Sequence, residues 1–176
     1  MKLKGHQSHY ENAVVAYLQE HNIPFVATNE GRKVVYNNIK IKNFDMILPG
    51  KEMLMVDIKG RKFGYESVPK NLWENWILKD DIESLKIWSS VSSSNQRAYL
   101  LYAFCLPDLG TDIPNAFIGN TFVFNDKVYA FFVISIEDYI NNSKPRSLKQ
   151  PTCCVSRKLF ATLVRPLSQM LAENKI

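Results

Sequence analysis

The chain has 176 residues, of which 46% are hydrophobic and 22% are charged, and its formal net charge is +5. This composition excludes a disordered protein and fits one globular domain, over residues 1–176, with a buried core. The longest apolar run, residues 98–106, is too short to cross a bilayer, and we expect neither a membrane span nor a secretory leader. Three cysteines without metal-ligand spacing favour a reducing compartment, so we expect a cytoplasmic protein.

The first half of the chain predicts one helix followed by strands. Apolar residues recur at helical spacing from Ser8 to Glu20, with Ser8 as the N-cap and Glu11 at the capping-box position. Stretches rich in β-branched and aromatic residues predict four strands: 25–28, 32–36, 44–48 and 53–62. The last two are expected to form a hairpin, because Pro-Gly-Lys-Glu at 49–52 is a strong turn sequence.

The middle of the chain predicts a helix and a deeply buried strand. Asp80 is expected to open the helix, with Glu83 at the capping-box spacing, and the serine-rich stretch 89–95 to end it. Residues 98–106 are apolar at successive positions, which is typical of a strand that helices cover on both faces.

The last third predicts a hairpin and a helix. The hairpin spans 122–134 and turns near Asn125-Asp126, and a polar, basic loop is expected at 141–150. An amphipathic helix follows from Ser156, and Pro166 should kink it or divide it in two. The order helix, strands, helix, strands, helix predicts an α/β sandwich with a mixed sheet.

Two apolar strands carry a carboxylate where a core residue is expected. Asp45 lies in the first strand of the 44–62 hairpin, Asp57 in the second, and Lys59 follows two positions later. Residues i and i+2 of a strand share a face, so Asp57 and Lys59 should point the same way. Charged groups are costly to bury unless they are paired or bind a metal. We expect chemistry here; the simpler alternative is a surface ion pair contributing about 0–1 kcal/mol.

This arrangement resembles the PD-(D/E)XK nuclease superfamily, which includes many restriction endonucleases and the archaeal Holliday-junction resolvases. The resemblance lies in Glu11 on the first helix, Asp45, and the run Asp57-Ile58-Lys59. His9-Tyr10-Glu11 together with 56–61 also resembles a group of uncharacterised bacterial proteins thought to belong there. One departure is Phe44, because no proline precedes Asp45.

The resemblance implies a restriction-endonuclease-like three-layer α/β/α sandwich with a mixed central sheet. Its core would be about residues 8–106, and 107–176 would complete it with the hairpin and the C-terminal helix. The apolar C-terminal helix would either form the interface of a homodimer or close the core of a monomer.

The carboxylates suit phosphodiester cleavage by a metal-activated water. Asp45 and Asp57 offer the hard oxygen ligands that Mg²⁺ prefers, with Mn²⁺ as a substitute. As the resemblance implies, the carbonyl of Ile58 would be a further ligand, and Glu11 would reach the ion directly or through water. Lys59 would position or deprotonate the water, or stabilise the transition state. We expect a Mg²⁺-dependent DNA endonuclease; the alternative is a non-catalytic nucleic-acid-binding module that retains the nuclease fold. For Glu11, the simpler alternative is a capping partner of Ser8 alone, and a third is that it serves both roles.

Basic residues are clustered along the chain. Residues 32–62 hold eight of them against three acids, and residues 144–165 hold six with no acid. Clustered basic charge favours a polyanionic partner, here the DNA backbone, although a solvated basic face would give the same pattern. The candidate DNA-binding residues are Lys40, Lys42, Arg61 and Lys62. The first two would also serve as edge-strand lysines that discourage aggregation.

Overall fold

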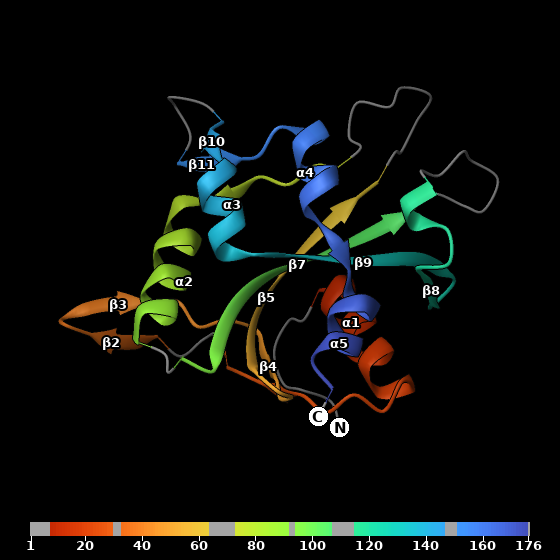
Figure 1. Cartoon of the computed structure of the whole chain (residues 1–176), viewed down its shortest axis with the longest axis horizontal. Helices are drawn as coiled ribbons and strands as arrows, with labels where there is room; N and C mark the ends of the chain where they lie inside the picture. The colour runs from red at the N-terminus through yellow and green to blue at the C-terminus, as the bar shows by residue number, and fades with distance from the viewer. Residues whose placement is uncertain are drawn as a thin grey trace.

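The computed structural model describes residues 8–29, 33–63, 73–91, 94–106, 115–146 and 151–175. In these ranges a seven-stranded sheet has the order β1-β4-β5-β7-β9-β12, and β8 also pairs with β9 (Figure 1). Its strands are β1 (Val26–Ala27), β4 (Met46–Leu48), β5 (Met53–Lys62), β7 (Gln96–Leu106), β8 (Thr121–Phe124), β9 (Lys127–Ser135) and β12 (Arg165–Pro166). The β5–β7 pair is parallel and the other pairs are antiparallel, so the sheet is mixed as predicted.

Helices cover both faces of this sheet (Figure 1). The two helices α1 (His9–Glu20) and α5 (Leu167–Glu173) lie on one face, in an apolar cluster that includes Val56 and Ile58 of β5. The other face is covered by α2 (Lys79–Val91), α3 (Ile136–Asn142) and α4 (Arg157–Leu163). The predicted three-layer α/β/α sandwich is therefore confirmed. In the described part of the chain, no helix is both long and apolar enough to cross a membrane.

Several local predictions hold because the sequence signal is a local one. Ser8 is the N-cap as predicted: its hydroxyl accepts the Glu11 N–H and donates to the Glu11 carboxylate, so the two expected capping residues pair with each other. The β8–β9 hairpin turns at Asn125 and Asp126, both with positive φ. Pro166 separates α4 from α5, so the C-terminal helix is divided in two rather than kinked.

Other predictions are wrong or incomplete. The helix α2 begins one residue early and ends at Val91, inside the serine-rich stretch 89–95 rather than before it. The predicted basic loop contains β10 (Lys144–Pro145), which joins β11 (Thr152–Cys154) and β6 (Ile77–Leu78) in a second sheet. The strand predicted at 32–36 is β2 (Val34–Tyr36), and its partner β3 (Ile39–Ile41) was not predicted. The clustered basic residues Arg32 and Lys149 lie outside the described ranges.

Gly60 allows α1 to lie directly on β5. A Cβ atom at Gly60 would come 2.1 Å from Cδ2 of Tyr10, which is far inside van der Waals contact. The N-terminal turn of α1 therefore rests on the residue that follows Lys59, and only glycine leaves room for it.

We predict that Gly60→Ala destabilises the protein, because overpacking of this kind costs about 1–3 kcal/mol. For a chain of this size, each kcal/mol lowers the melting temperature by about 2–4 °C. The same substitution in a Tyr10→Ala background should cost less, because the clashing ring is absent. An unchanged melting temperature for Gly60→Ala would show that α1 does not rest on this residue.

Candidate functional site

Strand alternation places Asp57 and Lys59 on the α2 face of the sheet. Leu54, Val56 and Ile58 belong to the apolar cluster under α1, whereas Met55 belongs to the opposite cluster. Asp57 and Lys59 share the direction of Met55 because they lie two and four positions after it. Asp57 is only 8% exposed, so its carboxylate is held inside the protein rather than on an open edge.

Lys59 is bound between two carboxylates. Its Nζ lies 2.6 Å from Oδ2 of Asp57 and 2.7 Å from Oδ2 of Asp81, which comes from α2. The second oxygen of Asp81 lies 2.8 Å from Nζ of Lys42. The four side chains form a chain of alternating charge, and the two carboxylates are neutralised by two ammonium groups.

Asp45 lies at the end of the β4–β5 ladder, whose terminal pair is Met46 and Val56. Its N–H donates to the Val56 carbonyl at 2.9 Å, and its carboxylate accepts the N–H of Ile58. The carboxylate therefore lies against the peptide that joins Asp57 to Ile58. The structure thus brings Asp45, Asp57, Ile58 and Lys59 together at one end of the hairpin.

One face of α2 fixes the chain just before Asp45. The carboxylate of Asp81 binds the Lys42 side chain, Ser84 Oγ accepts the Lys42 N–H at 3.1 Å, and Trp88 Nε1 donates to the Lys42 carbonyl at 2.9 Å. The Trp88 ring also packs edge-to-face on Phe44. Residues three and seven positions apart share a helix face, which explains how one helix reaches all of these groups.

Sequence reasoning did not identify Asp81. As one of two adjacent acids at the start of a helix, it has the pattern of a residue that complements the helix dipole. A usable signal was its spacing to Ser84 and Trp88, which places three hydrogen-bonding side chains along one stripe of the helix.

The charges set the protonation states of the cluster. Burial raises the pKa of Asp57, and Lys59 opposes this only in part. Burial also acts to lower the pKa of Lys59 and to raise that of Asp81, but the opposite charges outweigh it in both cases. The two carboxylates raise the pKa of Lys59, and Lys59 with Lys42 lowers the pKa of Asp81. Lys59 is therefore a firmly held cation, suited to stabilising negative charge.

The donor set fits a hard divalent cation. Oδ2 of Asp57 is buried, and its partner is the Lys59 ammonium at 2.6 Å. The Asp57 carboxylate, the Asp45 carboxylate and the Ile58 carbonyl are oxygen ligands of the kind that Mg²⁺ prefers. The described ranges contain no group of three or more His, Cys, Asp or Glu residues that could hold a metal. Two carboxylates suffice, because Mg²⁺ usually completes its coordination with water and substrate phosphates.

Glu11 does not join this cluster. The helix α1 packs on the face of the sheet opposite Asp57 and Lys59, and the Glu11 carboxylate accepts the Ser8 hydroxyl at the N-cap. Glu11 therefore lies in the cap of α1. To reach a cation bound by Asp45 and Asp57, its carboxylate would have to act around the end of the sheet.

The four candidate DNA-binding residues differ in their exposure and in their contacts. Arg61 donates to the carbonyls of Gly60 and Trp76, and its guanidinium lies 4.5 Å from the centre of the Trp76 ring. Both terminal nitrogens of its guanidinium therefore bind backbone carbonyls, whereas its buried Nε has no hydrogen-bond partner among the described residues. Lys62 is exposed at the end of β5, and Lys40 is exposed on β3. Lys42 is more than half exposed but is paired with Asp81.

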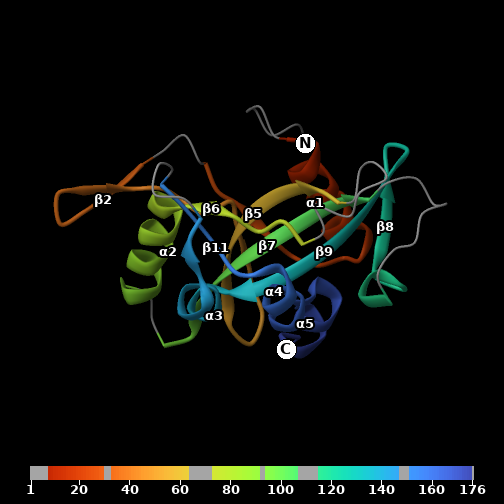
Figure 2. The same cartoon turned by 90° about the horizontal axis from the view of Figure 1, so that it is seen from above.

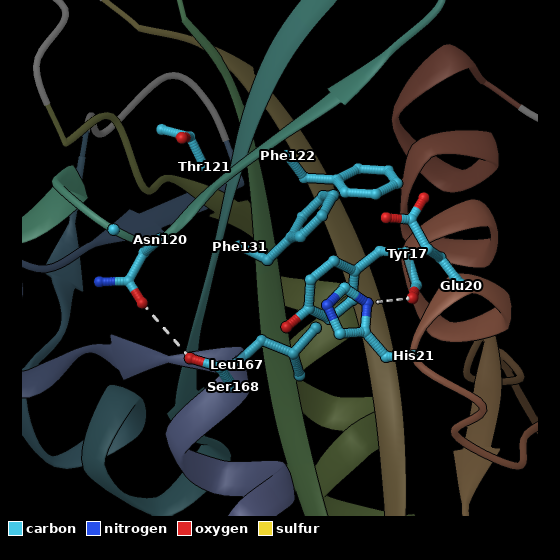
Figure 3. Close-up of a pocket in the computed structure, with 10 residues that line it drawn as sticks. Tyr17, Glu20, His21, Asn120, Thr121, Phe122, Phe131, Leu167 and Ser168 are labelled. Carbon is cyan, nitrogen blue, oxygen red and sulfur yellow. Dashed lines mark hydrogen bonds between the residues drawn. The ribbon is translucent and has the colours of Figure 1, made fainter.

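A cavity of about 330 Å³ lies on the other side of the sheet (Figure 3). It is enclosed by α1, β8 and α5, with Tyr17, Phe122 and Phe131 along its wall and Glu20 and His21 nearby. The His21 ring is bound to the Tyr17 carbonyl. Because this cavity lies on the α1 face, it takes no part in the Asp57–Lys59 cluster.

We predict that Asp81→Asn costs about 3 kcal/mol at pH 7, because it leaves the buried Lys59 with one carboxylate. The pKa of Asp81 is lower in the folded protein, so its stabilisation is fully present above the ordinary value of 3.8 and is lost as the pH falls through the folded pKa. The stability gap between wild type and variant should therefore close in acid.

Chemical denaturation at a series of pH values measures this gap. Lys42→Met serves as the matched control, because it removes the exposed partner of Asp81, and such pairs contribute about 0–1 kcal/mol. A gap that is independent of pH would contradict the ion-pair explanation.

Comparison with known proteins supports the fold. No protein-family model and no curated protein matches the chain. Among solved structures, the chain is similar to Hjc, a Holliday junction resolvase from the archaeal hyperthermophile Archaeoglobus fulgidus. The TM-score is 0.52 at 12% sequence identity, and the likeness covers 93% of this chain and 98% of that one. It confirms the predicted restriction-endonuclease-like fold; membership of the nuclease superfamily and the closer likeness to bacterial proteins stay predictions.

Proposed function

We propose that the protein is a Mg²⁺-dependent DNA endonuclease, with Mn²⁺ able to replace Mg²⁺. The observation that carries this proposal is the convergence of Asp45, Asp57, Ile58 and Lys59 at one end of a hairpin. The nuclease-type fold adds support, because the similar solved structure is a Holliday junction resolvase.

In this proposal, Asp45 and Asp57 would hold the cation together with the carbonyl of Ile58. Glu11, on the opposite face, would act only through water around the end of the sheet. A bound Mg²⁺ neutralises charge on the phosphate and lowers the pKa of a bound water. The cationic Lys59 donates hydrogen bonds to the phosphate oxygens, where negative charge develops in the transition state. Asp81 keeps the ammonium group of Lys59 in place, because it binds the group from the α2 side.

The DNA backbone is proposed to contact Lys40, Lys42 and Lys62, whose side chains reach solvent. Arg61 is proposed to contribute by holding Trp76 in place, because both terminal nitrogens of its guanidinium bind backbone carbonyls and the guanidinium lies over the Trp76 ring. The positive net charge of the chain favours association with a polyanion.

We predict that Asp45→Asn, Asp57→Asn and Lys59→Met each reduce the rate of plasmid nicking in Mg²⁺ by at least about 100-fold, which is typical for loss of a group that stabilises transition-state charge. In Asp45→Asn the amide oxygen can still accept the Ile58 N–H, so that variant removes charge while keeping the hydrogen bond. Glu137→Gln and Lys86→Met change exposed charges on α3 and α2 and should leave the rate unchanged. Full activity of Asp57→Asn and Lys59→Met would exclude this mechanism.

We also predict that Mg²⁺ or Mn²⁺ raises the melting temperature of the wild type. A cation that binds only the folded state stabilises it by about 2.7 kcal/mol at a hundredfold excess over its dissociation constant. The shift should disappear in Asp57→Asn and persist in Glu137→Gln. Equal shifts in both variants would place the cation elsewhere.

A non-catalytic nucleic-acid-binding module is the second candidate. It is favoured by the engagement of Lys59 with both Asp57 and Asp81, and by the position of Glu11 on the far face of the sheet. Such a protein would bind DNA equally well with and without a divalent cation and would not cleave it. The nicking assay separates the two candidates directly.

A further inference from the structure

The strands β2 and β3 form a ribbon that stands apart from the main sheet. They pair only with each other in the described ranges, with Val34 opposite Ile41, Val35 opposite Lys40 and Tyr36 opposite Ile39. Asn37 and Asn38, both with positive φ, close the turn. Both views show the ribbon extending past α2, away from the body of the protein (Figures 1 and 2).

The ribbon has an apolar face and a basic face. Directly opposed residues share a face, so Val34, Tyr36, Ile39 and Ile41 lie on one side. Alternation places Lys33, Val35, Lys40 and Lys42 on the other. Near the base, Ile41 is 2% exposed and anchors the ribbon to the body. Toward the tip, Tyr36 is 41% exposed and Ile39 is 56% exposed. Apolar side chains gathered at the tip of a projecting arm indicate a contact surface.

The charge of the ribbon indicates what it contacts. Between residues 33 and 44 the chain contains three lysines and no acid. An acid-free basic strand pair complements a polyanion, whereas two copies of it would repel each other. Its width also suits nucleic acid, because the major groove of a duplex admits a two-stranded β-ribbon.

The ribbon is fixed relative to the proposed catalytic cluster. Its last basic-face residue, Lys42, is held by Asp81, Ser84 and Trp88 of α2. Asp81 also binds Lys59, so the base of the ribbon and the cluster share one carboxylate. A duplex held by the ribbon would therefore have a defined position relative to Asp57 and Lys59.

We propose that the ribbon 34–41 is an arm that binds double-stranded DNA next to the phosphate to be cleaved, which rests on the proposed function and assigns a duplex as its substrate class. Lys33 and Lys40 contact backbone phosphates along one groove. Tyr36 and Ile39 enter the groove and pack against sugars and base edges. The arm thereby selects paired over unpaired strands, because only a duplex offers a groove.

Fluorescence anisotropy with a labelled duplex tests the arm, with Ca²⁺ in place of Mg²⁺ so that binding is measured without cleavage. Lys33→Gln with Lys40→Gln should weaken duplex binding and reduce the slope of log K against log salt by about 1.8, or about 0.9 for each phosphate that a lysine no longer neutralises. The matched control is Lys51→Gln with Lys175→Gln, which should change neither quantity. Both lysines are exposed, and Lys51, in the β4–β5 turn, lies in space beside the C-terminal residue Asn174.

Substitutions at the apolar tip should change duplex binding in a different way from the lysine substitutions. Tyr36→Ser with Ile39→Ser should weaken duplex binding about tenfold or more and leave the salt slope unchanged, because every lysine that neutralises a phosphate remains. Both side chains are exposed, so the melting temperature of this variant should match the wild type and exclude unfolding. The wild type should bind the corresponding single strand more weakly than the duplex. The tip substitutions should not change single-strand binding.

If the lysine and tip variants bind the duplex with the same affinity and salt slope as the wild type, the proposed DNA-binding role of the arm is wrong, whatever the cleavage assay gives. An equal loss of single-strand binding would overturn the duplex assignment. A wild-type dimer in sedimentation that the tip substitutions dissociate, with duplex affinity unchanged, would make the tip an interface between copies. If the arm variants lose duplex binding but the wild type cuts no DNA, the arm stands and the proposed catalysis fails.

Discussion

The position of Lys59 between the buried carboxylates Asp57 and Asp81 is the interaction on which the site depends. Two carboxylates this close would repel each other in a protein interior, and Lys59 is the cation that lets both remain inside. The arrangement also explains the distribution of pKa shifts, since Lys59 is kept protonated by the groups that it neutralises. The cluster is therefore both a structural element of the α2 face and a source of fixed positive charge where a phosphate would approach.

The helix α2 connects this cluster to the base of the β2–β3 ribbon. Asp81 reaches Lys59 on β5, and the same helix holds Lys42 at the base of the β2–β3 ribbon. Helix packing on a sheet thus does more than bury Ile82 and Leu85, because it sets the spacing between a projecting basic ribbon and a pair of carboxylates. On the opposite face, Gly60 and Tyr10 fix α1 against the same strand. The strand β5 is thus contacted from both faces at adjacent residues, Lys59 by α2 and Gly60 by α1.

Sequence reasoning succeeded where the signal was local. The N-cap pairing of Ser8 and Glu11, the 44–62 hairpin and the alternation at Asp57 and Lys59 each depend on residues a few positions apart. Asp81 was missed because its role depends on where α2 packs, which no local pattern specifies. The β2–β3 hairpin was missed because Asn37-Asn38 is a less familiar turn than Asn-Gly, although both residues adopt the positive φ that such a turn requires. Arg61 was assigned to phosphate, whereas tertiary contacts turn it toward Trp76.

The central claim is that Asp45 and Asp57 hold a divalent cation beside Lys59. Electron paramagnetic resonance of Mn²⁺ tests it most directly, because free Mn²⁺ gives a strong signal that bound Mn²⁺ loses. The account predicts saturable binding to the wild type that is lost in Asp57→Asn, weakened in Asp45→Asn and unchanged in Glu137→Gln. Binding that is absent from the wild type, or that survives in Asp57→Asn, would contradict it.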